Sequence, residues 1–594
     1  MFRERVRSTP DGRAILHRTG EGWGHLTWRE VGRRVRAQAC GLKALGVEEG
    51  DRVVILSGTR PEWVFADMAI LTAGAATTSI YPSNTPAECA HIIQDSGAVL
   101  LFAENEDLAR KVLQVRAEVP HLRRIVLFTG NSPGEDTVMT LEDLERAGAE
   151  WDRTHPGEID RIGDAVGPDH VATLVYTSGT TGKPKGVVLT HDAWVYEGEG
   201  MERTEILEPT DVQYLFLPLA HVFAKVVEIA FIRMGIPTVL DGNLDTLIDN
   251  LASVRPTFMA AVPRIFEKVY NKAVANARES GRVTWTVFQW AVGVGRQVSA
   301  IRQRGEEPTG LLAARYRVAD RLVFSKLRAR FGGRIRFFVS GGAPLSREIA
   351  EFFHAAGLVV LEGYGLTETS AASFVNRLVR FKFGTVGPTL PGTLVRIDSD
   401  GEILIKGRGV MRGYHNLPED TASMFTEDGY LRTGDVGFLD EDGYLVITDR
   451  KKDIIVTAGG KNVAPQNIEN MLRNRCPYVS NVVVHGDRRN FCTALVTIQE
   501  ESTARWAREQ QIPFTDYASL AARPEVKALV QQAVDEVNAE LASYESIKKF
   551  AILDHDFTQE SGELTPKMSV RRREVERRYR KLLDSFYSGS LERL

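Results

Sequence analysis

Apolar runs of strand length alternate with helix-like segments over the first 361 residues, and this alternation restricts the possible folds more than any other feature. The runs lie at 53–56, 125–128, 171–176, 214–217, 257–262 and 335–339. Strands separated by helix-length segments assemble into largely parallel sheets with helices packed on their faces. We therefore expect an α/β fold with several packed layers.

The pattern changes twice further along the chain. From Gly384 the sequence consists of short strands and tight turns, as in GEILIKGRG (401–409), which predicts a small β-rich unit. Mixed elements follow, including a helix that Pro465 opens, because proline is favoured at the first helical position. We expect a large domain over 1–450 and a small domain over 451–594.

Charge and cysteine usage exclude several classes of protein. The 594 residues include 74 Lys plus Arg and 78 Asp plus Glu, a net charge of −4. This balance argues against a nucleic-acid-binding protein, which needs surplus basic surface. Cys40, Cys89, Cys476 and Cys492 form no CxxC pair, so neither a disulfide framework nor a zinc site is expected. No apolar signal segment follows the charged N-terminus, and we expect a cytoplasmic protein.

The segment 283–295 raises the question of membrane association. It carries Trp285, Phe288 and Trp290 and is flanked by arginines. Such a helix either lies flat on a membrane surface, as a peripheral membrane contact, or covers the core with one basic end in solvent. The final helix carries a basic face that includes Arg572. The simpler interpretation of this basic face is a solvated surface.

The segment YTSGTTGKPKG (176–186) is the strongest local signal for ligand binding. It stands between two apolar runs, which predicts a strand, a loop and a second strand. Its glycines allow close backbone approach, its hydroxyls donate hydrogen bonds and its lysines are positively charged, a combination that suits a polyphosphate. It differs from the Walker pattern, in which GK precedes Ser or Thr and a helix. The residues concerned are the glycines Gly179, Gly182 and Gly186, the hydroxyl donors Ser178, Thr180 and Thr181, and the lysines Lys183 and Lys185.

Two further segments, VSGGAPLS (339–346) and EGYGLTET (362–369), place polar groups at strand ends. The tyrosine of the second segment can stack on a flat base, and its threonine and glutamate offer the hard oxygen ligands that suit Mg²⁺. Taken alone, either segment is equally well explained as a β-turn with a capping residue. The residues concerned are Gly342, Ala343, Pro344, Tyr364, Gly365, Thr367 and Glu368.

The segments GYLRTGD and DRKKDIIVTAGGKNVAPQNIE follow nearer the C-terminus. Asp435 can accept hydrogen bonds from both hydroxyls of a ribose, and Arg450 can approach the same sugar or a phosphate. A turn aspartate is the alternative for Asp435. Gly459 and Gly460 form a loop across which a second substrate can bind.

In this order, these segments resemble the acyl-adenylate-forming superfamily of acyl-CoA synthetases, luciferases and peptide-synthetase adenylation domains. The similarity spans most of the chain, from Thr27 to Arg572, and LPLAHVFAK, VPRIFEKVY and SGGAPLS are similar to the long-chain fatty-acid CoA ligases. The resemblance implies a large N-terminal domain of two α/β subdomains and a β-barrel, followed by a small mobile α+β domain.

The resemblance also implies roles for the residues of these segments. ATP would be held by Thr177 to Lys183, with Mg²⁺ at Thr177 and Glu368 and with Thr367 beside them in the catalytic site. The remaining implied contacts are adenine at Gly342, Ala343, Pro344, Tyr364 and Gly365, ribose at Asp435 and Arg450, the interdomain hinge at Lys452, and CoA at Gly459 and Gly460.

Two assignments keep an alternative. Lys567 is the candidate for the lysine that assists adenylation, although many long-chain relatives place that lysine two positions later, where this chain has Ser569. An exposed lysine without a catalytic role is the alternative. His221 either guards an acyl tunnel or is a buried, hydrogen-bonded structural histidine.

The implied reaction activates a fatty acid with ATP and transfers it to CoA, with Mg²⁺ as cofactor and no protein partner evident. The sequence thus predicts an AMP-forming long-chain-fatty-acid CoA ligase. An acyl-AMP ligase that loads a separate carrier protein, a CoA ligase for medium-chain or aromatic acids, and a non-catalytic nucleotide-binding protein are the alternatives. A hydrolase is set aside, because Pro133 follows Ser132 in GNSPG and lacks the N–H that an oxyanion needs.

Overall fold

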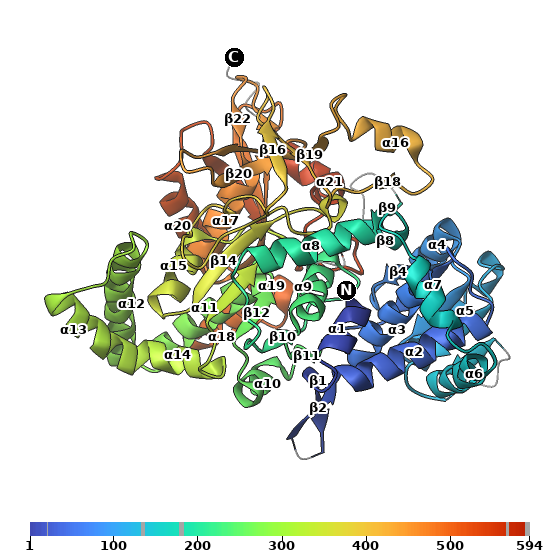
Figure 1. Ribbon diagram of the computed structural model, residues 1–594. Coiled ribbons are helices and arrows are strands. Elements are labelled where there is room, and N and C mark those ends of the chain that lie inside the picture. The colour runs from blue at the N-terminus through green and yellow to red at the C-terminus, as the bar shows by residue number, and fades with distance from the viewer. Residues whose placement is uncertain (21, 132–136, 178–182, 566–568, 588–594) are drawn as a thin grey trace. The chain divides into compact units, whose positions relative to one another are not determined.

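A computed structural model of the chain (Figure 1) describes all residues except 21, 132–136, 178–182, 566–568 and 588–594. The described chain divides into two units. The first comprises Met1–Arg396, Leu404–Thr433 and Leu439–Leu445, and the second comprises Ile397–Ile403, Gly434–Phe438 and Val446–Leu594.

Within the described residues, the first unit contains two eight-stranded sheets. One has the order β18-β9-β8-β4-β3-β5-β6-β7, in which β9 and β18 are antiparallel additions to an otherwise parallel sheet. Its strands are β3 (Arg52–Leu56), β4 (Ala76–Ile80), β5 (Leu100–Ala103), β6 (Arg124–Leu127), β7 (Val138–Thr140), β8 (Val171–Thr177), β9 (Lys185–Thr190) and β18 (Gly413–Tyr414).

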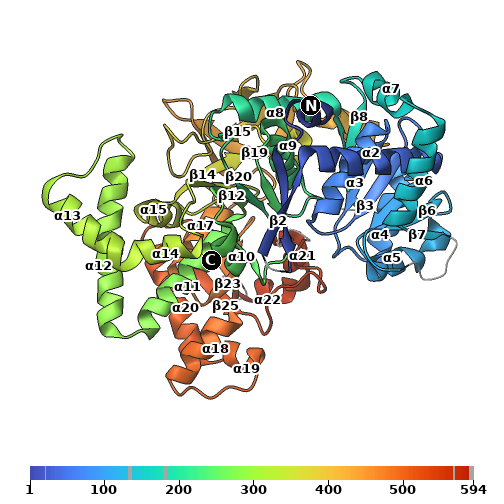
Figure 2. The ribbon, with the colours of Figure 1, turned by 60° about the horizontal axis from the view of Figure 1, so that its bottom comes forward.

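This sheet is covered on both faces, which explains why strands such as β3 and β5 are almost entirely apolar in sequence. On β3, Val53 and Ile55 belong to the core cluster that contains Trp63 of α3 (Pro61–Thr72), whereas Val54 and Leu56 belong to a separate cluster with α4 (Pro86–Ser96). Figure 2 shows α2 (Trp28–Ala44) and α3 on one side of the strands and α4 and α5 (Glu106–Leu113) on the other.

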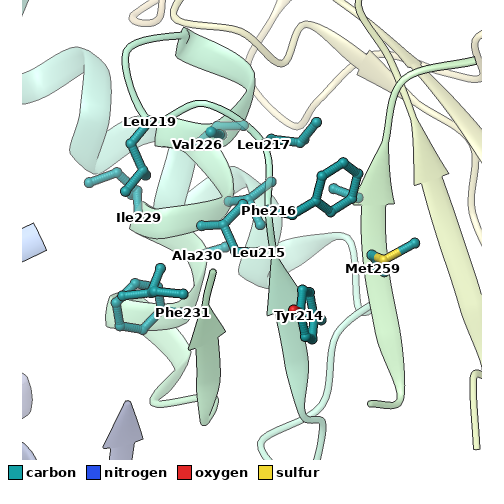
Figure 3. Close-up of a cluster of buried hydrophobic side chains, with 14 of the residues drawn as sticks. Tyr214, Leu215, Phe216, Leu217, Leu219, Val226, Ile229, Ala230, Phe231 and Met259 are labelled. Carbon is teal, nitrogen blue, oxygen red and sulfur yellow. The ribbon is translucent and has the colours of Figure 1, made fainter. Parts of the chain in front are cut away.

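The other large sheet has the order β15-β14-β13-β12-β10-β11-β1-β2, with antiparallel pairing at both edges. Its strands are β1 (Arg13–Thr19), β2 (Gly22–Thr27), β10 (Gln213–Leu215), β11 (Thr238–Leu240), β12 (Phe258–Ala261), β13 (Phe337–Ser340), β14 (Val359–Tyr364) and β15 (Phe374–Val375). Figure 3 shows the core beside β10, where Leu215 and Leu217 belong to one cluster of buried side chains with Ile229 and Phe231 of α9 (Val222–Met234).

The predicted α/β fold is confirmed, because each of the six apolar runs overlaps a strand: β3, β6, β8, β10, β12 and β13. The segment proposed to lie on the core or on a membrane forms α12 (Arg282–Arg302), which buries Phe288, Ala291 and Val294 on one face. None of the described helices is both long enough and apolar enough to cross a membrane.

Other helices of the first unit cover these sheets or connect them. They are α1 (Phe2–Ser8), α6 (Leu141–Thr154), α7 (Glu158–Ala165), α8 (His191–Arg203), α10 (Leu247–Val254), α11 (Pro263–Glu279), α13 (Gly310–Ala319), the π-helix η2 (Asp320–Phe324), α14 (Ser325–Arg330), α15 (Arg347–Ala355) and α16 (Pro418–Ser423).

The β-rich segment after Gly384 forms a four-stranded sheet, the half-barrel counterpart of the expected barrel. Its order is β16-β17-β19-β20, over Leu394–Ile397, Glu402–Lys406, Leu431–Leu439 and Leu445–Arg450. Pro465 opens α17 (Pro465–Arg475), as predicted.

In the second unit, the strands β23 (Val479–His485), β24 (Cys492–Ile498) and β25 (Ile547–Ile552) form a sheet with helices on both faces. Val482 and Val484 face α17 and α20 (Pro524–Asn538), whereas Val483 faces Val575 of α21 (Arg572–Arg578). This alternation makes the C-terminal unit α+β, as expected.

The interpretation of Arg572 as a solvated residue is wrong. Its side chain is 14% exposed, donates to the Val484 carbonyl across 2.6 Å and forms an ion pair with Glu469 of α17 across 2.5 Å. Because the final helix is split at Tyr579 into α21 and α22 (Arg580–Ser585), the expected single basic face is also interrupted.

Candidate functional site

The hairpin of β8 and β9 carries the predicted phosphate loop. Thr177 pairs with Lys185 where the strands meet the loop, whereas Ser178, Gly179, Thr180, Thr181 and Gly182 lie outside the described residues. The Lys183 side chain is exposed. The Lys185 ammonium lies 3.2 Å from Asp420 and 5.2 Å from the ring centre of Tyr414, so it is directed toward protein partners.

Glu368 lies on a 3-10 turn, Thr367–Thr369, that follows β14. The turn is held by a hydrogen bond from the Leu366 N–H to Thr369 Oγ1 (2.9 Å), and the Met411 N–H donates to the Glu368 carbonyl (2.8 Å). Thr367 is buried and Glu368 is half-buried. The turn therefore fixes the backbone from which the Glu368 carboxylate projects.

Tyr414 links this turn to the hairpin. Its hydroxyl donates to Glu368 Oε1 across 2.8 Å, and its backbone on β18 pairs with Val187 of β9, two residues beyond Lys185. The structure thus brings Glu368 to the hairpin that carries Thr177 and Lys183. The sequence analysis missed Tyr414, because nothing in MRGYHN indicates which strand this short segment will join.

A hydroxyl and a carboxylate gathered beside a phosphate loop are hard oxygen donors, and this donor set fits Mg²⁺. A second group of acidic side chains consists of Asp398, Asp400 and Glu402, and a lysine ammonium lies against it. The Lys451 ammonium lies 2.5 Å from Asp400 and 2.9 Å from Glu402, so this group is part of an ion-pair network.

The predicted adenine residues lie at the carboxyl edge of β13 and β14, which pair in parallel with Ser340 opposite Glu362. Gly342, Ala343 and Pro344 form an exposed turn after β13, and Tyr364 ends β14, with Gly365 directly after it. Ligands of open α/β sheets bind at this edge, because the loops that leave the strands gather there.

Glu362 is a second residue that the sequence analysis missed. Its side chain is buried and accepts a hydrogen bond from the Leu345 N–H across 3.3 Å, which ties β14 to the Gly342–Pro344 turn. Burial raises the pKa of Glu362 to about 7. The carboxyl group therefore changes charge near neutral pH directly behind the turn.

His221 caps the N-terminus of α9, where its Nδ1 accepts a hydrogen bond from the Phe223 N–H across 3.0 Å. The ring of Phe223 lies 3.3 Å from the position a Cβ would take on Gly341. His221 is half-buried, so it has the structural contact of one interpretation, while its part in an acyl tunnel stays a prediction.

In the second unit, Asp435 of β19 is buried and lies 3.2 Å from Arg450, the last residue of β20. The pair brings together the two residues predicted for ribose. Lys451 follows with its N–H donating to the Gly434 carbonyl (2.9 Å), and the next residue, Lys452, is exposed.

Gly459 and Gly460 lie at an exposed turn between β21 (Ile455–Val456) and β22 (Asn462–Val463). The Gly460 N–H donates to the Thr457 carbonyl across 2.8 Å. Lys567 lies outside the described residues, as does Ser132, while the flanking Thr565 N–H donates to the Ser569 carbonyl across 2.8 Å.

Comparison with known proteins agrees with this arrangement. Residues 2–415 match the model of the AMP-binding enzyme family, and residues 452–591 match the AMP-binding enzyme C-terminal domain. The long-chain-fatty-acid–CoA ligase FadD15 of Mycobacterium bovis is 41% identical over 99% of this chain and 96% of its own length. The human long-chain-fatty-acid–CoA ligase ACSBG1 is 31% identical over 99% of this chain and 84% of its own.

Solved structures share the fold. The adenylation domain of a carboxylate reductase from Mycobacterium chelonae aligns with a TM-score of 0.73 at 23% identity, covering 99% of this chain and 90% of that one. ATP-bound MatB from Rhodopseudomonas palustris aligns with a TM-score of 0.69 at 23% identity, covering 98% and 99%. The ordered motifs, the sheets and these matches over nearly the whole length show that the chain belongs to the AMP-binding enzyme family.

Proposed function

We propose that this protein is a long-chain-fatty-acid–CoA ligase that forms AMP. The observation that carries the nucleotide chemistry is the link from Glu368 through Tyr414 to the β8–β9 hairpin. The choice of a long-chain acid rests on the FadD15 and ACSBG1 relatives, which are named for that reaction.

In the first half-reaction, a fatty-acid carboxylate oxygen attacks the α-phosphorus of ATP and the bond to pyrophosphate breaks. The chain positions the reactants and offsets charge, which is the main task of a protein in phosphoryl chemistry. The hairpin residues Thr177 to Lys183 would hold the phosphates. Mg²⁺ held by Thr177 and Glu368, with Thr367 beside them, would neutralise phosphate charge when bound.

The nucleoside would be held at its two ends by separate groups. Gly342, Ala343 and Pro344 would contact adenine with Tyr364 and Gly365, and Asp435 would accept the ribose hydroxyls with Arg450 as its partner. We assign Lys567 the role of offsetting the negative charge that develops during adenylation, because it is the candidate lysine of the C-terminal segment.

In the second half-reaction, the thiol sulfur of CoA attacks the acyl carbon of the acyl-AMP, the thiol loses its proton and AMP leaves. Gly459 and Gly460 would present the backbone turn across which CoA binds. Lys452 would be the hinge at which the C-terminal domain, 451–594, turns between the half-reactions. His221 would stand at the entrance for the acyl chain.

The test uses purified protein with ATP, Mg²⁺, CoA and a series of acids from acetate to long-chain fatty acids. Exchange of labelled pyrophosphate into ATP reports the first half-reaction, and AMP with acyl-CoA reports both. We expect exchange and thioester formation to be greatest with long-chain acids.

Other outcomes distinguish the alternatives. Exchange with long-chain acids but no acyl-CoA would indicate an acyl-AMP ligase that loads a carrier protein. A maximum with medium-chain or aromatic acids would change the substrate class. ATP binding without exchange for any acid would contradict the proposal altogether.

A further inference from the structure

Exposed apolar side chains gather on one helical segment of the first unit. Within the part of the chain that the structure describes, Val283 and Trp290 of α12 and Leu311, Val318 and Leu322 of α13 and η2 are between 37% and 79% exposed. We call these five residues the α12–α13 surface. Figures 1 and 2 both show α12 and α13 side by side, at the edge of the picture.

The spacing of these residues places them on one face of each helix. Leu311, Val318 and Leu322 are seven and four residues apart, and Val283 and Trp290 are seven apart, which corresponds to about two turns. An adjoining face of α12 is occupied, because α12 buries Phe288, Ala291 and Val294 in the core and packs against α15 at Gly295. The exposed face is therefore fixed in its outward direction.

The charge of this region is opposite to that of the whole chain. Residues 278–334 include twelve basic and four acidic residues, whereas the whole chain has a net charge of −4. Three of these acidic groups are paired within the segment: Glu306 with Arg304 (3.8 Å), Glu307 with Arg302 (3.1 Å) and Asp320 with Arg328 (2.6 Å).

Three arginines of α13 and η2 have no acidic partner among the described residues. Among the described residues, Arg315, Arg317 and Arg321 are exposed and make no ion pair with an acidic side chain. Arg315 lies four residues after Leu311 and three before Val318, so it belongs to the same helix face. Basic groups thus stand within and beside the apolar side chains.

We propose that the α12–α13 surface docks on a lipid bilayer that carries anionic headgroups. Apolar side chains would enter the boundary between headgroups and acyl chains, and the arginines would contact the headgroups. Each arginine near an anionic membrane is expected to raise binding about fivefold. A second copy of the chain fits this surface less well, because its own arginines would face like charge.

This inference goes beyond the proposed function, because it concerns where the protein lies and not the reaction at the nucleotide site. Its test also needs no turnover. Binding of the full-length protein to sedimenting vesicles is measured with phosphatidylcholine alone and with phosphatidylcholine plus phosphatidylglycerol, at low and high salt. We expect binding at least about tenfold stronger to the anionic vesicles, weakened by salt.

Matched variants separate the apolar and the basic contributions. Leu311→Gln/Val318→Gln/Leu322→Gln should lower binding more than about tenfold, whereas Leu394→Gln, which changes an equally exposed leucine of β16, should leave it unchanged. Arg315→Gln/Arg321→Gln should lower binding about twentyfold at low salt, whereas Arg124→Gln/Arg146→Gln, which removes the same charge elsewhere, should have little effect.

A fluorescent probe tests the same surface directly. The four native cysteines are buried, so Leu311→Cys and Leu394→Cys can each be labelled selectively with an environment-sensitive dye. Anionic vesicles should shift the emission of the dye at position 311 to shorter wavelength and leave that at position 394 unchanged. Equal shifts at both positions would overturn the proposal.

Two further results would also overturn it. One is binding that does not distinguish anionic from neutral vesicles or is absent from both. The other is a lipid-free oligomer that Leu311→Gln/Val318→Gln/Leu322→Gln dissociates in light scattering, which would make this face an interface between copies. The ligase assays of the proposed function are independent of each result.

Discussion

The hydroxyl of Tyr414 donates a hydrogen bond to the carboxylate of Glu368 across 2.8 Å, although 46 residues separate the two in the chain. The contact exists because β18 joins the antiparallel edge of the sheet beside β9. It orients the carboxylate that we propose for Mg²⁺ and connects it to the strand that leaves the phosphate loop.

Tyr414→Phe should slow pyrophosphate exchange about tenfold and raise the Mg²⁺ concentration needed for half-maximal rate, because a hydrogen bond to a charged group contributes about 1.5–3 kcal/mol. The measurement is exchange as a function of Mg²⁺. Tyr444→Phe is the control, since its hydroxyl donates to the Arg380 carbonyl across 3.1 Å. Equal Mg²⁺ dependence in the two variants would contradict the assigned role.

Gly365→Ala should abolish exchange and lower the yield of folded protein. A Cβ on Gly365 would lie 1.6 Å from the Ala371 carbonyl oxygen, so the turn that carries Glu368 must move. Gly443→Ala is the comparison, because no atom lies within 4 Å of its Cβ position and only its φ of +79° is strained, a cost of about 1 kcal/mol. Thermal unfolding and exchange measure both, and similar behaviour of the two variants would argue against this geometry.

Lys225→Met should destabilise the protein by about 3–5 kcal/mol, because it leaves buried acidic groups without their cation. Lys225 pairs with Asp67 and lies 3.0 Å from Glu228, and all three side chains are buried. Burial raises the pKa of Glu228, so that the three groups together approach neutrality.

Urea unfolding measures this effect. Lys225→Met/Asp67→Leu should recover part of the loss, and Arg110→Met, which breaks an exposed pair with Asp107, should cost less than about 1 kcal/mol. A Lys225→Met variant as stable as Arg110→Met would disprove the importance of the buried cluster.

The contribution of His354 to stability should fall as pH is lowered from 6.5 toward 4, while the raised pKa of Glu362 acts in the opposite direction. Burial lowers the pKa of His354 from 6.5 to about 4, and its Nδ1 lies 2.8 Å from Ser299 Oγ. A depressed folded-state pKa means that the unfolded chain takes up the proton first, so stability is complete above the unfolded value and is lost below it, by up to about 3 kcal/mol for one histidine.

The measurement is the free energy of unfolding at a series of pH values. His354→Gln should remove this contribution from the pH dependence in this window, whereas the similarly lowered pKa of His191, also about 4, leaves a contribution of its own. His155→Gln, which changes an exposed histidine, should leave the slope as it is. An unchanged slope in His354→Gln would refute the assignment.

Lys567→Ala should slow acyl-AMP formation by about 100-fold, the scale of losing one charged transition-state contact. Thioester formation from supplied acyl-AMP should be affected less. Pre-steady-state release of pyrophosphate is the measurement, and Lys581→Ala, at an exposed lysine of α22, is the control. Near-normal pyrophosphate release in Lys567→Ala would show that another residue assists adenylation.

The sequence predicted the elements that depend on neighbouring residues. The apolar run at 171–176 became β8, and Pro465 opened α17, because hydrophobic periodicity and the fixed φ of proline act locally. The loop motifs were recognisable for the same reason, since the glycines and hydroxyls of each loop are consecutive in the chain.

The partners of charged side chains were not predictable. Arg572 was expected in solvent, yet it lies against Glu469, 103 residues away, because α21 and α17 pack on opposite faces of one sheet near its edge strand β23. Lys185 is one of the charged residues of the phosphate-loop segment, and its ammonium lies 3.2 Å from Asp420. The sequence alone does not show whether a basic residue contacts solvent, a ligand or a carboxylate.

By itself, the sequence determined the alternating strands and helices, the glycine-rich loops and the family to which they belong, because short-range periodicity and backbone preference are written in adjacent residues. Only the tertiary structure decided that Tyr414 meets Glu368, that Arg450 meets Asp435 and which face of α12 is exposed. Those contacts depend on strand order and helix packing, which bring together segments whose own sequences do not indicate one another.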